Sequence, residues 1–405
     1  MVAIANKISK KTTIRKQTSL GVVGSATGQI LRRTSSVFKA ERDMYASNEI
    51  VSNHQSSGVS YGLKKTSGSI AGELSAGTYQ IPIEGVLEAV FAATVTTGAL
   101  TTIAAASGTP DTFTDSANGF LTAGFKVGMV VRASGFTGAG VTANNSRNFW
   151  LVGVTAGVLS GIFLDGTAMV SDAAGESVTI TSSGKTCSPP LTSHTKEYHQ
   201  IEEWYSDLTD SDLFSDCIAA GLEFGLPASG NATFGCSYVG LSRALSGSQV
   251  MTSPTAETET GIMAAVNGRL YVNGATTPVT GVTISVSNSA ANVGAEIGSN
   301  TSSDVSRQVI RVSGQFTSLL RDQVISTLYD AETAVSLAVV LTADETATSA
   351  FMSFTLGKIK ITGDAPDDSD AIMRTYPFVA EINHAGGAAL AWAETILTVQ
   401  DSAAA

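Results

Sequence analysis

The stretch Thr66-Ser-Gly-Ser-Ile-Ala-Gly-Glu-Leu74 and the segment Pro82-Ile-Glu-Gly-Val-Leu-Glu-Ala-Val-Phe91 decide the fold that we expect. The first belongs to a region, beginning at residue 49, of alternating apolar residues and turn residues, which is typical of strands. The second has apolar residues at 83, 86, 87, 90 and 91, the spacing of one buried helical face. A proline lies near its first turn, where helices tolerate it. The sequence therefore predicts strand structure followed by a short helix.

The composition changes between residues 98 and 185, which are rich in Gly, Ala and Thr and nearly neutral. Short β-like runs at 128–132, 148–154 and 176–181 are each bounded by Gly, Asn or Asp, the residues that form turns. This pattern predicts a small all-β insertion domain over residues 98–185.

Strand patterns return after residue 186. Residues 207–217 are acidic and are predicted as a loop, and residues 246–262, rich in Ser, Gly, Thr, Pro and Glu, as a linker. A second helix is predicted at 319–329. The remaining strand patterns lie at 196–204, 222–226, 232–238, 269–272, 282–286, 309–316, 334–341, 351–356, 358–361 and 376–382.

The order of elements recurs in the two halves of the chain. Asn48-Glu-Ile50 leads through polar residues to Ser67-Gly-Ser-Ile70 and a helix, and Ser287-Asn288 leads similarly to Ser313-Gly-Gln-Phe316 and the second helix. Self-similarity over a long period indicates a repeated unit. Because few residues are identical between the copies, two unrelated β-sandwiches in series remain the alternative.

These patterns together predict a mainly β chain with two tandem β-sandwich domains, each flanked by a short helix, and the insertion domain. The predicted divisions are an extended N-terminal arm (1–47), a first sandwich (48–97 and 186–245), the insertion (98–185), the linker (246–262) and a second sandwich (263–405).

Charge is distributed unevenly along the chain. Residues 1–42 hold nine of the 24 Lys and Arg residues and one of the 35 acidic residues, although the net charge is −11. A basic arm therefore precedes an acidic body. Phe38 is the only aromatic residue among residues 1–42, which disfavours stacking on single-stranded nucleic acid. We expect contact with an acidic neighbouring subunit, with a solvated tail or phosphate binding as alternatives. The candidate contact residues are Lys7, Lys10, Lys11, Arg15, Lys16, Arg32 and Arg33.

Signals for catalysis are weak. The four histidines (His54, His194, His199 and His384) include no HExxH pair, and no GxSxG or P-loop motif occurs. The acidic clusters Asp207, Asp210, Asp212, Asp216 and Asp364, Asp367, Asp368, Asp370 lack the spacing of a calcium loop and are interpreted as solvated loops. Cys187, Cys217 and Cys236 form no CxxC motif and are interpreted as reduced, buried thiols. We expect no catalytic site, cofactor or metal.

Targeting signals are also missing from the sequence pattern. The first residues are basic but no apolar run follows them, so no signal peptide is predicted. The longest apolar stretch, residues 86–106, is interrupted by Glu88, Gly98 and five threonines, which argues against a membrane span.

Several segments in this order resemble the tail tube (major tail) proteins of long-tailed bacteriophages. They are Ser47-Asn-Glu-Ile50 with Ser52 and Gln55, Ser67 to Tyr79, Val86-Leu-Glu-Ala89, Ile201-Glu-Glu-Trp-Tyr205 with Phe214, Ala219-Ala-Gly-Leu-Glu-Phe224, and Gly314-Gln-Phe-Thr317 with Asp322. The resemblance covers about 40–245 and 265–385, without residues 98–185. No single segment is specific, and the ordered combination carries the resemblance.

The resemblance implies a structural virion protein of the tail, assembled in the host cytoplasm, whose β-sandwiches form rings that stack around a DNA-conducting lumen. A duplicated tube domain implies trimeric, pseudo-hexameric rings; a hexamer is the alternative if the repeat is false. The implied partners are the protein itself, a tape-measure protein, a tail terminator and DNA in transient, non-specific passage. The acids that face the lumen are unknown. Alternative functions are a capsid-decoration or baseplate protein, a carbohydrate-active enzyme and a DNA-binding module.

Overall fold

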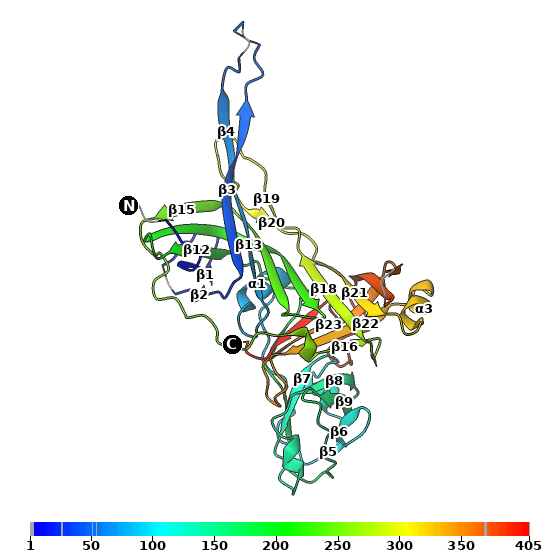
Figure 1. The fold of residues 1–405 in the computed structure, drawn as a ribbon. Coiled ribbons are helices and arrows are strands. Elements are labelled where there is room, and N and C mark those ends of the chain that lie inside the picture. Colours follow the sequence, from blue (N-terminus) through cyan, green and yellow to red (C-terminus); the bar gives the residue numbers. More distant parts are fainter. Residues whose placement is uncertain (1–3, 26, 51, 54, 368–370, 405) are drawn as a thin grey trace.

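The protein is described by a computed structural model that covers residues 4–25, 27–50, 52–53, 55–367 and 371–404. Strands make up 46% of the chain and helices 7%, so the expectation of a mainly β fold is confirmed. Figure 1 shows a broad twisted sheet, a hairpin that projects from one side of it, and a smaller β unit on the opposite side. His54, Asp368 and Asp370 lie outside the described residues.

Strand β13 (Asp210–Pro227) joins the two halves of the chain. Its first part pairs with β12 (His199–Tyr205) and β15 (Ser242–Ser246), and its second part pairs with β14 (Thr233–Gly240) and β18 (Val279–Ser287). The pairing of β13 with β18 makes one continuous sheet from strands that the sequence assigns to two sandwiches. A large shared core of buried residues runs through both halves.

The N-terminal strands surround this first part. Strand β1 (Lys10–Lys16) pairs with β12 and with the short β2 (Gln29–Ile30). Strands β3 (Ser35–Ala46) and β4 (Val59–Glu73) form a long hairpin, and β4 also pairs with β14. The expected extended arm over 1–47 is therefore wrong for residues 10–16 and 29–46, because their backbones are paired within the sheet.

The glycines of the opening stretch explain its composition. A Cβ on Gly68 would lie 2.2 Å from the ring of Phe38, and one on Gly72 would lie 2.0 Å from the Tyr79 hydroxyl. That hydroxyl donates to the carbonyl oxygens of Arg32 and Glu73. Only residues without a side chain leave room for the two aromatic rings on this face of β4.

Helix α1 (Gln80–Leu87) packs its apolar face against β13, as the spacing of its apolar residues predicts. The predicted end at residue 91 is too late, because Glu88 adopts a left-handed conformation (φ 57°) that terminates the helix. The second helix, α3 (Val324–Asp330), lies within the predicted range 319–329 apart from its last residue.

The second half extends the sheet beyond β18. The order of strands is β18, β21, β25, β23, β22 and β16, and β26 joins β23 to β11. The bounds are β11 (Lys185–Cys187), β16 (Gly268–Val272), β17 (Ala275–Thr276), β19 (Ala291–Asn292), β20 (Val305–Ser306), β21 (Arg311–Leu319), β22 (Val335–Thr342), β23 (Phe351–Ile361), β24 (Ala365–Pro366), β25 (Met373–Ala380) and β26 (Thr398–Asp401), with a 3-10 turn at Ala265–Asn267.

A separate six-stranded sheet lies within residues 103–182 and has its own apolar core. Its strands are β5 (Ile103–Ala106), β6 (Asp111–Asp115), β7 (Val130–Ser134), β8 (Phe149–Val154), β9 (Val158–Phe163) and β10 (Thr179–Ser182), with helix α2 (Phe120–Ala123) and a 3-10 turn at Val141–Asn144. A third buried cluster ties this sheet to the body, because Val130 and Trp150 pack with Val340 and Phe351.

Two irregular segments differ from expectation. The predicted acidic loop 207–217 is wrong from residue 210 onward, because β13 begins there and buries Ser211, Leu213 and Phe214. Residues 247–264 contain no assigned strand or α-helix, but Met251 is fully buried. The carboxylate of Glu202 accepts hydrogen bonds from the backbone N–H groups of Val250 and Met251, which holds this segment against the sheet.

Candidate assembly surfaces

The basic residues predicted as arm contacts lie on or beside β1. Its β-branched residues Thr12, Thr13 and Ile14 are fully buried, and such residues favour a pleated, packed strand. Strand β12 supplies a complete antiparallel partner from Lys10 opposite Tyr205 to Lys16 opposite His199. The cations of β1 are therefore held in fixed positions on the sheet.

Two of these cations form ion pairs inside the molecule. The Lys10 ammonium lies 2.6 Å from Glu203 Oε1 and also donates to the Ser36 carbonyl oxygen. The Lys16 ammonium lies 2.6 Å from Glu84 Oε2 and 2.7 Å from Glu197 Oε1. Burial lowers the pKa of Lys16, but its hydrogen bonds to Glu197 and Glu84 outweigh burial and leave that pKa raised.

The other five predicted contact residues differ in exposure and in their partners. The guanidinium of Arg32 donates to the Thr260 carbonyl oxygen, and that of Arg33 donates to the carbonyl oxygen of Lys10. Lys7 and Lys11 are exposed. Arg15 is half-buried beside them and makes a polar interaction of its own. The structure thus commits Lys10, Lys16, Arg32 and Arg33 to contacts within the chain.

The histidine of β12 lies beneath this region. His199 is fully buried under α1, and its Nε2 is 3.8 Å from Glu197 Oε2, beyond hydrogen-bond length. Burial lowers the pKa of His199. Burial raises the pKa of Glu197, but the nearby His199 and the hydrogen bond from Lys16 outweigh burial and leave that pKa lowered. His194 lies elsewhere, 3.3 Å from Glu88, so the two histidines form no joint site.

The β3–β4 hairpin presents an apolar face that sequence reasoning missed. Met44 pairs directly with Tyr61, and Ala46 pairs with Val59, so these four side chains share one face of the hairpin. Met44 is 67% exposed, Tyr61 72% and Val59 58%. Figure 1 shows this end of the hairpin projecting away from the sheet. We call these four residues the tip face.

The acidic residues of the two clusters that the structure describes are held by partners within the chain. Asp207 accepts a hydrogen bond from the Asn6 N–H, Asp212 pairs with Arg243, and Asp216 accepts bonds from the Gly21 N–H and the Gln17 amide. Asp364 pairs with Arg374. In the part of the chain that the structure describes, no three His, Cys, Asp or Glu residues are placed to hold a metal ion.

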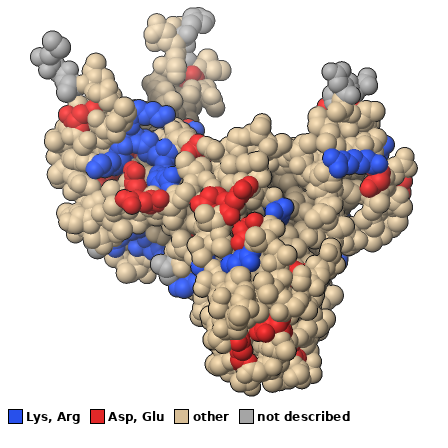
Figure 2. Space-filling view, turned by 60° about the horizontal axis from the view of Figure 1, so that its bottom comes forward, with Lys and Arg blue, Asp and Glu red and all other residues tan. Residues whose placement is uncertain are grey.

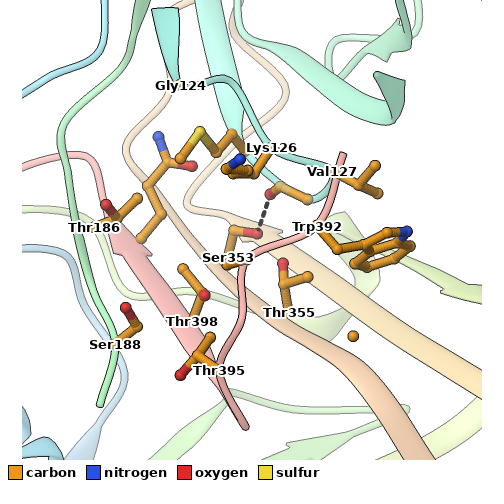
Figure 3. A pocket seen from close by; sticks show the side chains of 15 residues that line it. Gly124, Lys126, Val127, Thr186, Ser188, Ser353, Thr355, Trp392, Thr395 and Thr398 are labelled. Carbon is orange, nitrogen blue, oxygen red and sulfur yellow. Dashed lines mark hydrogen bonds between the residues drawn. The ribbon is translucent and has the colours of Figure 1, made fainter. Parts of the chain in front are cut away.

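A cavity lies where the six-stranded unit meets the body, between Lys126, Thr186, Ser353, Trp392 and Thr398 (Figure 3). The Ser353 hydroxyl donates to the Gly128 carbonyl oxygen, and the Lys126 ammonium donates to the Gly387, Ala388 and Leu390 carbonyl oxygens. Among the described residues that line it, none is a carboxylate, an imidazole or a thiol. Burial lowers the pKa of Lys126, the titratable side chain of this lining, but its nitrogen is held by three carbonyl oxygens and not by the hydroxyl groups.

The three cysteines, Cys187, Cys217 and Cys236, are all buried, and none of them forms a disulfide. Burial raises the pKa of Cys236 to about 12 and that of Cys187 and Cys217 further. A thiol with such a pKa is a poor nucleophile at neutral pH. All three cysteines are free and buried, as the sequence interpretation expects.

Charged side chains gather in small neighbouring patches of both signs on the face shown in Figure 2, and most of that face is uncharged. The largest basic group on that face, at the upper left of the view, adjoins acidic residues. In the described residues no helix is long and apolar enough to cross a membrane.

The comparison with protein families agrees with these features. Residues 10–380 match the family model described as phage tail tube protein, and this match spans both halves and the inserted unit. No curated protein matches the sequence. Because the match covers nearly the whole chain, the protein belongs to the phage tail tube protein family, which makes it a structural component of the virion.

Proposed function

We propose that this chain is the major tail tube subunit, which self-assembles into stacked rings that form a hollow tail and deliver phage DNA. The tip face is the observation that best supports assembly. It exposes Met44, Val59 and Tyr61 on the outer part of the hairpin that β3 and β4 form. A two-stranded hairpin is marginal alone in water, and exposed apolar faces of this kind are typical of protein interfaces.

The two halves fit a duplicated tube unit. In each half a long strand leads into a short helix, β4 into α1 and β21 into α3. We infer that residues 48–97 with 186–245 form one unit, that 263–405 form the other, and that 246–262 connect them. Three chains then complete a pseudo-hexameric ring. A ring of six chains is the alternative if the two units are not equivalent in the assembly.

We infer that the insertion, residues 98–185, lies on the outer side of the tube. It covers the face of β22 and β23 that carries Val340 and Phe351, while the other face of β22 packs in the main core. A domain of this size on the inner side would fill the channel that DNA must pass. A tube whose diameter is unchanged after its removal would contradict this placement.

The exposed basic residues retain their proposed role in contacts between rings. Lys7 and Lys11 are exposed; Lys11 lies in β1 together with the half-buried Arg15, and Lys7 precedes that strand. Lys10, Lys16, Arg32 and Arg33 serve their own chain. Acidic residues that face the lumen would repel DNA phosphates and let DNA slide. A tape-measure protein and a tail terminator are the further partners expected, with assembly in the host cytoplasm.

Electron microscopy of the purified protein tests this function. Long hollow tubes with a countable rotational symmetry are expected, and discrete particles alone would contradict the proposal. The variant with Met44→Ser and Tyr61→Ser should form few or no tubes, because the tip face becomes polar. The matched control is Val266→Ser, which changes an apolar residue that is 80% exposed elsewhere on the chain.

A further inference from the structure

The cavity shown in Figure 3 is bounded on one side by three neighbouring strands, β11, β26 and β23. In this register Gln400 lies between Thr186 on β11 and Ser353 on β23, and Thr398 is paired with Thr355. Paired residues share one face of a sheet, as do residues two positions apart on one strand. These five polar side chains therefore form two rows on the same face, and all five line the cavity.

The first row has a structural role. The Gln400 amide accepts a hydrogen bond from the Val130 N–H and donates to the Val130 and Ser183 carbonyl oxygens. The Ser353 hydroxyl donates to the Gly128 carbonyl oxygen. These bonds attach the inserted unit to the strands of the body, which explains why Gln400 and Ser353 are polar.

The second row has no such role. Among the described residues, the hydroxyl groups of Thr355 and Thr398 have no hydrogen-bond partner within the chain, and the same holds for Ser188, which follows β11 and also lines the cavity. Thr355 is only 8% exposed. A buried hydroxyl group without a partner costs free energy, so its presence in a folded protein requires an explanation. Three available hydroxyl groups thus line one cavity.

The other walls of the cavity supply apolar surface and no free charge. Met129 and Trp392 are the large apolar side chains. The Lys126 ammonium donates to three carbonyl oxygens of residues 387–390, which uses all three of its donors. The described lining residues include no carboxylate. Apolar walls with a few placed polar groups are typical of small-molecule sites, and here the polar groups are neutral.

We propose that this cavity binds one small, uncharged molecule that carries several hydroxyl groups, such as a single sugar ring. Its volume of about 200 Å³ equals about seven water molecules at their liquid volume, which suits a triol or one ring. Hydroxyl groups of the ligand pair with Thr355 and Thr398, and its C–H groups pack against Trp392. Thr186, Ser188 and Trp392 are half-buried, so the cavity reaches the surface beside them.

This site goes beyond the proposed tube function and does not depend on assembly. Ligand-observed NMR with the full, unassembled chain tests it, with glycerol, glucose, galactose and N-acetylglucosamine as probes. We expect saturable binding of at least one probe. Thr355→Val and Thr398→Val remove a hydroxyl group at similar shape, and each should weaken that binding by about threefold to tenfold without lowering the melting temperature. The matched control is Thr283→Val, a half-buried threonine of β18 outside the cavity, which should leave binding unchanged.

Two further probes identify the charge and the source of the ligand. Glucuronate, a sugar ring with a carboxylate, should bind no more tightly than glucose, and tighter binding would overturn the neutral class because it would show that Lys126 pairs with anions. A disaccharide that binds as well as its single sugar would indicate the end of a glycan, and loss of binding would indicate a free sugar. If no probe binds saturably, or if Thr355→Val and Thr398→Val bind as the wild type does, the cavity holds only water and the proposal is wrong.

Discussion

Strand β1 and the tip of the β3–β4 hairpin come from the same N-terminal region, yet they have opposite environments. Strand β1 has a partner along its whole length in β12, and Ile14 is fully buried. The outer part of β3 pairs only with β4, and Met44 and Tyr61 remain more than half exposed. The difference shows that available pairing partners, and not local charge, decide which segment joins the body. Four predictions test this contrast, ordered by their effect on stability.

The largest effect is expected at the centre of β1. Ile14→Ala should lower the free energy of unfolding by about 2–5 kcal/mol, because it removes a fully buried side chain and leaves a cavity. Urea denaturation followed by fluorescence measures this. Lys11→Ala, on the exposed side of the same strand, should change the free energy by less than about 0.5 kcal/mol. Equal effects at both positions would show that β1 is not packed as described.

The next effect concerns the ion cluster at the end of β1. Lys16→Met should destabilise the fold by about 1–3 kcal/mol, because Glu84 and Glu197, whose side chains are mostly buried, lose their shared cation. Lys39→Met is the matched control, since Lys39 and Glu41 form an exposed pair whose loss costs about 0–1 kcal/mol. Thermal melting of the two variants at low and high salt measures these effects. If Lys16→Met and Lys39→Met gave identical melting curves, the proposed role of the ion cluster would be refuted.

A smaller, pH-dependent effect is expected from His199. Because burial lowers its pKa, the unfolded chain binds a proton first, and stability from this group is lost as pH falls through about 6.5. We therefore expect the free energy of unfolding to be lower at pH 6.0 than at pH 7.5. The faces around His199 also carry Lys16, Glu84, Glu197 and Tyr238.

Asp401 changes stability in the opposite direction. Burial raises the pKa of Asp401 to about 6, although Gly77 and Ala403 donate backbone hydrogen bonds to its carboxylate. The contribution of Asp401 to the free energy of unfolding therefore falls as pH rises toward 6. The comparison of wild type with His199→Leu at both pH values removes this background. If the pH dependence of the two proteins is the same, His199 is not the titrating group.

The smallest effect on stability is expected at the tip face. Met44→Ser combined with Tyr61→Ser should alter the free energy of unfolding by less than about 0.5 kcal/mol, because both side chains already contact water. Denaturation in dilute, unassembled protein provides the measurement. A loss of several kcal/mol would mean that these residues pack within their own chain.

The positions of some helices and strands could be predicted from the sequence, because the spacing of a few apolar residues determines them. The apolar spacing at 83, 86 and 87 correctly places α1, and the alternation over 334–341 correctly places β22. The start of β13 was missed because acidic residues at 210, 212 and 216 favour a loop locally. In the structure Arg243 balances Asp212, and the buried Asp216 accepts bonds from Gly21 and Gln17.

The candidate surfaces are harder to predict, because their contacts join residues that are far apart in the sequence. The charges of β1 are visible in the sequence, but the partners of Lys10 and Lys16 come from residues 203, 84 and 197, which no local pattern brings together. The tip face had a weak signal, since Met44, Ala46, Val59 and Tyr61 alternate along two strands. Recognising it required the hairpin register, which the intervening loop sequence does not specify.

Strand β13 has a mechanical consequence. Its 18 residues run as one strand from the strands around β12 to the strands around β18, a distance of about 60 Å at strand rise. A pull along this strand loads many hydrogen bonds in parallel, so they must break together. The register shift between Ala219 and Gly221 is the one place along its pairing with β14 where this ladder is interrupted. When a tail bends in solution, we expect the two halves of each subunit to flex there.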